Sequence, residues 1–168
     1  MNTQLKISGL TLMLLIFFNA NAQENKKDEG WITGNSITYS SPIGNMDSYN
    51  YGLGFYANVD YIFNKHITAR LDIGWNEFTG SDHKYIDTEG NFHSTKPTKS
   101  VWEFTAGLRA NAGILYIEGR GGYFTGIHEW GVVPAVGLRY KKFDLQANFT
   151  MANGYHWGGL RLAYYWGK

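Results

Sequence analysis

Apolar and polar residues alternate along most of this chain with a period of two. In the segment FDLQANFTM (143–151), Phe143, Leu145 and Ala147 alternate with Asp144 and Gln146. Successive side chains of an extended strand point to opposite faces, so this period indicates a strand with one apolar and one polar face. The same alternation recurs in the segments 51–63, 67–75, 101–110, 115–123, 132–141 and 159–166. The pattern predicts a run of antiparallel strands.

An eighth strand is predicted over 31–40 (WITGNSITYS), which is rich in β-forming residues although neither face is clearly apolar. The connections around the strands alternate in length. Short links at 64–66, 111–113 and 141–142 would lie at one end, and longer links at 41–48, 79–99 and 125–129 at the other, with 153–155 as a short exception. Bacterial outer-membrane barrels have an even number of strands, short periplasmic turns and longer outer loops. We therefore expect an all-β fold, an eight-stranded antiparallel up-and-down transmembrane β-barrel.

The charged residues of the predicted strands share one face, and the opposite face carries none. Arg or Lys on the lipid face at mid-membrane costs about 2–4 kcal/mol, and an eight-stranded barrel is only wide enough inside for side chains to fill it. We therefore predict that the charged face points inward as a packed, nearly neutral network and not as a pore lining. The predicted interior network comprises Asp60, Arg70, Asp72, Glu103, Arg109, Glu118, Arg120, Arg139, Lys141, Asp144 and Arg161.

Aromatic residues of the apolar face gather near the strand ends. Trp and Tyr favour the headgroup depth of a bilayer, so two such groups predict two girdles. The predicted interface aromatics are Trp75 and Trp102 near the outer end, and Tyr61, Tyr140, Tyr164 and Trp166 near the inner end. A soluble, lipocalin-like ligand-binding barrel would also alternate, with its apolar face inward, and remains an alternative. The unequal loop lengths favour the membrane barrel.

The N-terminus has the features of an export signal. A basic residue, Lys6, precedes an apolar run from Ile7 to Phe18, and Ala20 and Ala22 follow in the A-x-A spacing of a cleavage site. The run is too short to cross a bilayer as a helix. We expect residues 1–22 to be a signal peptide and residues 23–168 to form the barrel domain.

Composition adds two constraints. The chain has no Cys, so no disulfide holds the exported domain, and its formal net charge of +1 does not favour nucleic-acid binding. It has 21 Gly and 3 Pro, with 12 Tyr and 6 Trp, which suits a barrel with aromatic girdles. Pro134 cannot donate a ladder hydrogen bond, so we expect a bulge or a late strand start there.

The chain resembles the small eight-stranded outer-membrane barrels of the OmpA/OmpX type. The resemblance spans about residues 31–166 and rests on the architecture and on the segments PAVGLRYKKFDLQANF (134–149) and GGLRLAYYW (158–166). It implies a place in the outer membrane of a Gram-negative bacterium, among its lipids, and recognition of the last strand by the barrel-assembly machinery. Gly167 and Lys168 follow Trp166, where the family usually ends on Phe.

No catalytic, cofactor or metal-binding motif is evident. The favoured hypothesis is a non-enzymatic barrel that serves the envelope or binds an extracellular partner through the loop 79–99, because loops on a rigid scaffold carry most binding. The alternative is a lipid-modifying enzyme that uses Glu77 and His156, which share the apolar-face parity at outer strand ends. A His and an acid without a nucleophile fall short of a triad, so rim positions are the preferred interpretation of this pair.

Overall fold

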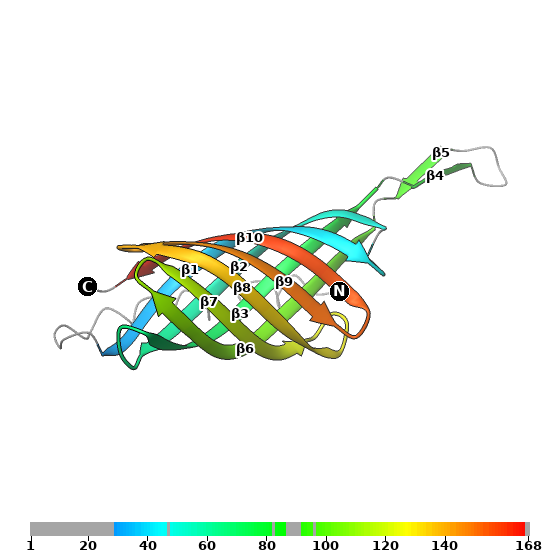
Figure 1. Cartoon of the computed structure of the whole chain (residues 1–168). Helices are drawn as coiled ribbons and strands as arrows, with labels where there is room; N and C mark the ends of the chain where they lie inside the picture. The colour runs from blue at the N-terminus through cyan, green and yellow to red at the C-terminus, as the bar shows by residue number, and fades with distance from the viewer. Residues whose placement is uncertain (1–28, 47, 82, 87–91, 96, 167–168) are drawn as a thin grey trace, which may run out of the picture.

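Backbone hydrogen bonds close the chain into a barrel in the computed structural model, which describes residues 29–46, 48–81, 83–86, 92–95 and 97–166. The antiparallel strands follow the order β1-β10-β9-β8-β7-β6-β3-β2, and β1 pairs with both β2 and β10 (Figure 1). The barrel strands are β1 (Gly30–Gly44), β2 (Tyr49–Ile62), β3 (Ile67–Gly80), β6 (Thr98–Ala112), β7 (Leu115–Phe124), β8 (Glu129–Tyr140), β9 (Phe143–Ala152) and β10 (Tyr155–Trp166). The predicted eight-stranded antiparallel up-and-down barrel is confirmed. The predicted signal peptide lies outside the described residues.

The segment between β3 and β6 is not a simple loop. It contains a hairpin of β4 (His83–Ile86) and β5 (Phe92–Thr95), which pair with each other as a separate two-stranded sheet. The hairpin projects beyond the barrel on the continuation of β3 and β6, at the end opposite to the one where β10 finishes (Figure 1). The predicted loop 79–99 therefore contains a β-hairpin, which the outer ends of β3 and β6 carry.

Several strands, β3 and β10 among them, are longer at this outer end than the alternation predicted. β3 continues to Gly80, past the predicted end at Trp75, and β10 begins at Tyr155, before the predicted start at Gly159. Both extensions lie where the polarity of the two faces is reversed: Phe78 and Trp157 are buried inside, whereas Glu77 and His156 lie on the outward parity. A prediction that requires apolar residues outward and polar residues inward therefore ends these strands too early.

Pro134 does not cause the bulge or late start that was expected. It lies inside β8 opposite Gly119 of β7, and the β8–β9 register is the same on either side of it, with Val132 opposite Met151 and Ala135 opposite Asn148. Because proline has no N–H, it omits a hydrogen bond without shifting the register. The bulge in these ladders lies in β2 instead, between Tyr49 and Tyr51.

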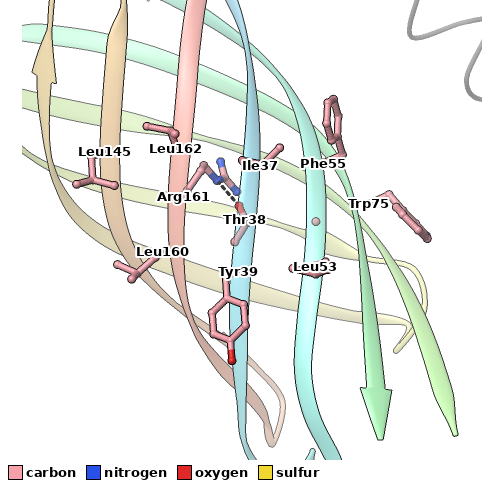
Figure 2. A pocket seen from close by; sticks show the side chains of 11 residues that line it. Ile37, Thr38, Tyr39, Leu53, Phe55, Trp75, Leu145, Leu160, Arg161 and Leu162 are labelled. Atoms are coloured by element: carbon pink, nitrogen blue, oxygen red, sulfur yellow. Dashed lines mark hydrogen bonds between the residues drawn. The ribbon is translucent and has the colours of Figure 1, made fainter. Parts of the chain in front are cut away.

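The side chains of the barrel strands alternate between the interior and the outer surface. On β10, Leu160 and Leu162 point outward while Arg161, between them, points inward and donates to Thr38 Oγ1 at 3.2 Å (Figure 2). Large apolar residues are exposed on all eight strands, including Ile37, Leu53, Leu71, Leu108, Ile117, Val136, Leu145 and Leu160. The fold therefore has an apolar outer surface and a polar interior, the reverse of a soluble barrel. None of the described residues forms a helix that is long and apolar enough to cross a membrane.

Glycines make room for two tyrosines in the narrow interior. A Cβ on Gly74 would lie 1.9 Å from the ring of Tyr56, and one on Gly137 would lie 2.3 Å from the Tyr116 hydroxyl oxygen. Guanidinium groups lie over the same two rings, Arg161 over Tyr56 at 3.8 Å and Arg109 over Tyr116 at 3.6 Å. Each tyrosine therefore contacts both a glycine backbone and an arginine of the charged network.

Candidate functional site

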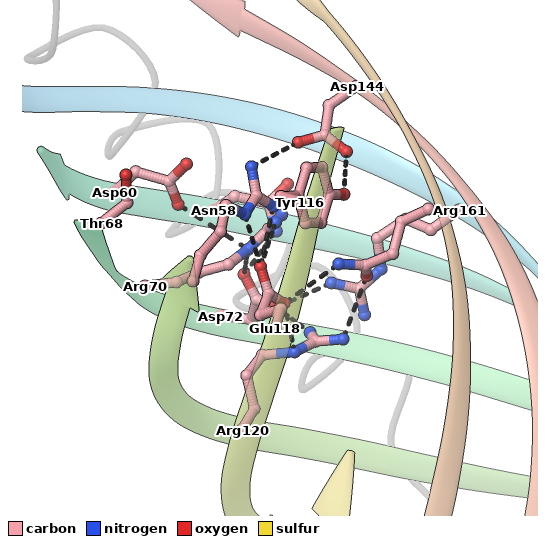
Figure 3. Close-up of polar contacts among 12 residues, drawn as sticks. Asn58, Asp60, Thr68, Arg70, Asp72, Tyr116, Glu118, Arg120, Asp144 and Arg161 are labelled. Atoms are coloured by element: carbon pink, nitrogen blue, oxygen red, sulfur yellow. Dashed lines mark hydrogen bonds and ion pairs between the residues drawn. The ribbon is translucent and has the colours of Figure 1, made fainter. Parts of the chain in front are cut away.

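Two carboxylates at the centre of the barrel organise the interior. Asp72 of β3 contacts the guanidinium groups of Arg70, Arg120 and Arg161, with Arg70 Nε at 2.9 Å and Arg161 Nη1 at 2.7 Å (Figure 3). Glu118 of β7 contacts Arg70 at 3.2 Å and both Arg109 and Arg120 at 2.8 Å. Arg70 and Arg120 each bridge the two acids. The result is a continuous cluster across the lumen.

Other side chains tie the remaining strands to this cluster. Arg109 Nη1 donates to Asp144 Oδ2 of β9 at 2.7 Å, and the Tyr116 hydroxyl donates to Asp144 Oδ1 at 2.5 Å. Arg139 of β8 donates to Asp60 Oδ2 of β2 at 3.1 Å. With Thr38 of β1 bonded to Arg161, every barrel strand contributes a side chain. The cluster therefore cross-links the whole wall from inside.

The interior holds most of the predicted network and excludes one member. Ten of the predicted residues point into the barrel; Glu103 is among them but forms none of these ion pairs. Lys141 does not: it is exposed in the turn between β8 and β9, with φ 54°. Its prediction as an interior residue was wrong, because β8 ends at Tyr140 and the alternation stops there. Without it the interior acids and arginines balance, five against five.

The outer end of the lumen is filled by an apolar layer that the alternation did not predict. Phe78, Phe124 and Trp157 meet there, with ring centroids 5.4 Å apart for Phe78–Trp157 and 5.5 Å apart for Phe124–Trp157. Val101 and Met46 complete the contacts, all fully buried. The sequence did contain a signal for this layer. Phe78 lies six residues after Asp72, and Trp157 four residues before Arg161, so each shares the inward face of its strand. Charged and apolar layers together occupy the interior.

The interface aromatics form two groups. At the inner end, Tyr164 packs against Trp166 at 4.7 Å and against Phe143 at 5.3 Å, and Tyr61 packs against Trp31 at 4.8 Å. Tyr140 is exposed at the same end.

At the outer end the aromatic pairs differ from those predicted. Trp75 and Trp102 are directly opposite each other, but five residues below Gly80, where the β2–β3 ladder ends. They lie deeper than predicted because β3 and β6 continue beyond them. Tyr123 with Trp130 (5.4 Å) and Tyr39 with Tyr51 (6.3 Å, stacked) lie near the outer strand ends instead.

The structure does not bring the proposed enzymatic pair together. Glu77 lies on β3 and His156 on β10, with β2 and β1 between them, so strand spacing alone separates their backbones by roughly 14 Å. The His156 ring stacks on Phe149 at 6.2 Å. Among the residues that the structure describes, no group of three His, Cys, Asp or Glu side chains could hold a metal ion. Four of the five interior acids, Asp60, Asp72, Glu118 and Asp144, form ion pairs with arginines, so the arrangement is suited to structure more than to proton transfer.

The closed eight-stranded barrel, its outward apolar surface and its charged interior define an all-β, antiparallel barrel fold like that of OmpX and Ail. A solved structure of Ail, the attachment invasion locus protein of Yersinia pestis, in complex with the heparin analogue sucrose octasulfate, superposes with a TM-score of 0.50. The match covers 82% of this chain and 98% of that chain at 14% identity, so it shows a common fold. No protein-family model and no curated protein matches the sequence.

Replacing Arg109 by Met tests the network. The substitution keeps the bulk but leaves Glu118 and Asp144 each without one cationic partner, and an uncompensated buried charge costs about 3–5 kcal/mol. The control is Lys65→Met, an exposed residue of the β2–β3 turn outside the network, which should change the unfolding free energy by about 0.5 kcal/mol or less. Unfolding free energies from denaturant titration in lipid vesicles measure both. Equal, small losses would contradict a network that stabilises the barrel.

Proposed function

We propose that this chain is a non-enzymatic integral protein of the Gram-negative outer membrane, with its short turns in the periplasm. The outward surface supports this location. On β8, Trp130 and Tyr140 bound an apolar stretch that includes Val132, Val136 and Leu138. Ten residue steps span about 33 Å along a strand, or about 25 Å of height at a tilt of about 40°, which equals the apolar band of such barrels. A soluble barrel would not expose an apolar band of this height to water.

The interior is packed with side chains, which argues against a channel and against an enzyme with an internal active site. The cluster around Asp72 and Glu118 crosses the lumen, and the apolar layer around Trp157 lies above it. A side-chain-filled lumen of eight strands leaves no aqueous path. The separation of Glu77 from His156 supports the non-enzymatic hypothesis, because the sequence offered these two residues as its acid–base pair. We therefore look for the function in the segments that project from the outer end of the barrel.

The observation that carries the proposal is the projecting hairpin (Figure 1). β4 and β5 pair only with each other in a two-stranded sheet, so each keeps one open backbone edge among the described strands. Open edges bind extended peptides by adding a strand. β3 and β6 carry this sheet away from the barrel and give it a rigid base. We propose that the hairpin within 79–99 binds an extracellular protein partner.

The heparin analogue bound to Ail raises sulfated glycans as a second class of ligand. Here the segment 79–99 contains three acidic residues and three lysines, so its charge is balanced apart from two histidines. Binding of a polyanion needs an excess of positive charge. The balance favours a protein partner over a sulfated glycan.

Insertion into a membrane predicts a depth-dependent cost of charge. Ile37 lies at the middle of β1 and Ile43 near its outer end, and both are about half exposed on the outward face. Ile37→Arg should destabilise the barrel by about 2–4 kcal/mol and Ile43→Arg by about 0–1 kcal/mol. Unfolding titrations in vesicles measure the difference. Equal costs for the two variants would indicate a surface in water.

Orientation can be tested with single cysteines, because the natural chain has none. Ser81 and Lys65 are both exposed, the first beside the hairpin and the second in the turn between β2 and β3. A membrane-impermeant maleimide should label S81C on intact cells and K65C only after the outer membrane is permeabilised. The reverse pattern would overturn the proposed orientation.

Replacing residues 82–96 by Gly-Asn-Gly tests the role of the hairpin. The barrel should still shift on boiling in SDS gels, because its eight strands and their closure remain intact. Cells carrying the whole chain and cells carrying the shortened one are compared on one panel of immobilised extracellular proteins and sulfated glycans. Proteins that bind only the whole chain support the proposal; equal binding, or binding of sulfated glycans alone, contradicts it.

A further inference from the structure

A cavity of about 820 Å³ lies at the periplasmic rim, between the β8–β9 turn and the end of β10. It crosses the rim from inside to outside. Arg139 and Tyr165 line it from the lumen, whereas Tyr140, Phe143 and Tyr164 line it from the outward face. Ile32 and Ile62 complete the inner wall. One side is therefore the polar mouth of the barrel, and the other belongs to the inner aromatic girdle.

The cavity has a strong positive character. The turn itself is Lys141-Lys142, and both residues line the cavity beside Arg139. Arg139 lies over the Tyr165 ring at 3.7 Å and donates through Nη1 to Asp60, while its buried Nη2 has no hydrogen-bond partner among the described residues. Neither lysine belongs to an ion pair of the described interior network. Two lysines and the guanidinium group of Arg139 thus give the lining of the cavity a positive charge.

The turn geometry does not account for a lysine at position 141. Its φ of 54° is left-handed, a conformation that costs a residue with a Cβ about 1–2 kcal/mol and that Gly or Asn adopts more easily. The side chain is exposed, and its Nζ lies over the Tyr140 ring at 5.3 Å from the centroid. The conformation of the turn therefore does not require a lysine at this position.

We propose that this rim cavity binds the headgroup of an anionic phospholipid from the periplasmic leaflet. The phosphate contacts Lys141, Lys142 and Arg139, and the acyl chains run along the outward aromatic surface at Phe143 and Tyr164. Basic residues next to a membrane surface attract anionic lipids. A soluble anion would satisfy the charges, but only an amphiphile also uses the outward half of the cavity. This inference rests on the membrane insertion and orientation proposed above.

The test is lipid selectivity of the purified mature barrel in detergent. Native mass spectrometry compares binding of phosphatidylglycerol and phosphatidylcholine with identical acyl chains. The variant Lys141→Asn/Lys142→Gln removes both charges and retains the turn, because Asn tolerates the left-handed conformation. The matched control is Lys65→Gln, an exposed lysine in another turn of the same end that does not line the cavity.

We expect wild-type protein and the Lys65 variant to prefer phosphatidylglycerol, and the double variant to lose about 25-fold of that preference, about 5-fold per lysine. An unchanged preference in the double variant, or an equal loss in the Lys65 variant, would overturn the site. Co-flotation with vesicles separates the two proposals. If no protein inserts, the membrane proposal itself fails; if all insert and none selects lipid, only the rim site fails.

Discussion

Closure of the backbone ladder is the constraint on which the rest of this structure depends. β1 pairs with β2 on one side and with β10 on the other, from Thr33 opposite Trp166 to Gly44 opposite Tyr155, so the first and last strands leave no open edge in the barrel. In a hydrocarbon environment an unpaired N–H or C=O costs several kcal/mol, and a closed barrel is the β-structure that avoids it. Closure at eight strands then sets the diameter, and the diameter sets what the interior can hold.

The narrow interior explains the packing inside. Arginines can be buried only if acids meet them, because an unpaired charge in a medium of low dielectric constant is strongly unfavourable. Asp72 and Glu118 meet this need by each contacting three arginines. Space is just as limited: Gly74 and Gly137 lack side chains where Tyr56 and Tyr116 fill the lumen. The apolar layer at the outer end adds packing beyond the charged cluster.

Because side chains fill the lumen, both proposed binding sites lie at the ends of the barrel. At the outer end, long β3 and β6 hold the β4–β5 sheet away from the wall, which suits the binding of a partner. At the inner end, a tight two-lysine turn joins the polar mouth to the aromatic girdle, which suits a lipid headgroup. Both proposed sites use the barrel as a rigid scaffold.

The sequence by itself determined the fold class, the approximate limits of the strands and the face on which most side chains lie. It did so because side chains alternate strictly in a strand, and apolar residues outward with charged residues inward is a local pattern. Register was decided only by the tertiary structure: Asp72 meets Arg161 and Arg139 meets Asp60 across separations of 89 and 79 residues, which no local pattern encodes. The Phe78–Trp157 layer was hidden for a related reason, since at the outer rim the polarity of the faces reverses. The exclusion of Lys141 depended on where the chain turned, and the rim cavity on how that turn met β10. Pairing across the lumen is set by closure of the whole barrel, so only the folded chain could reveal it.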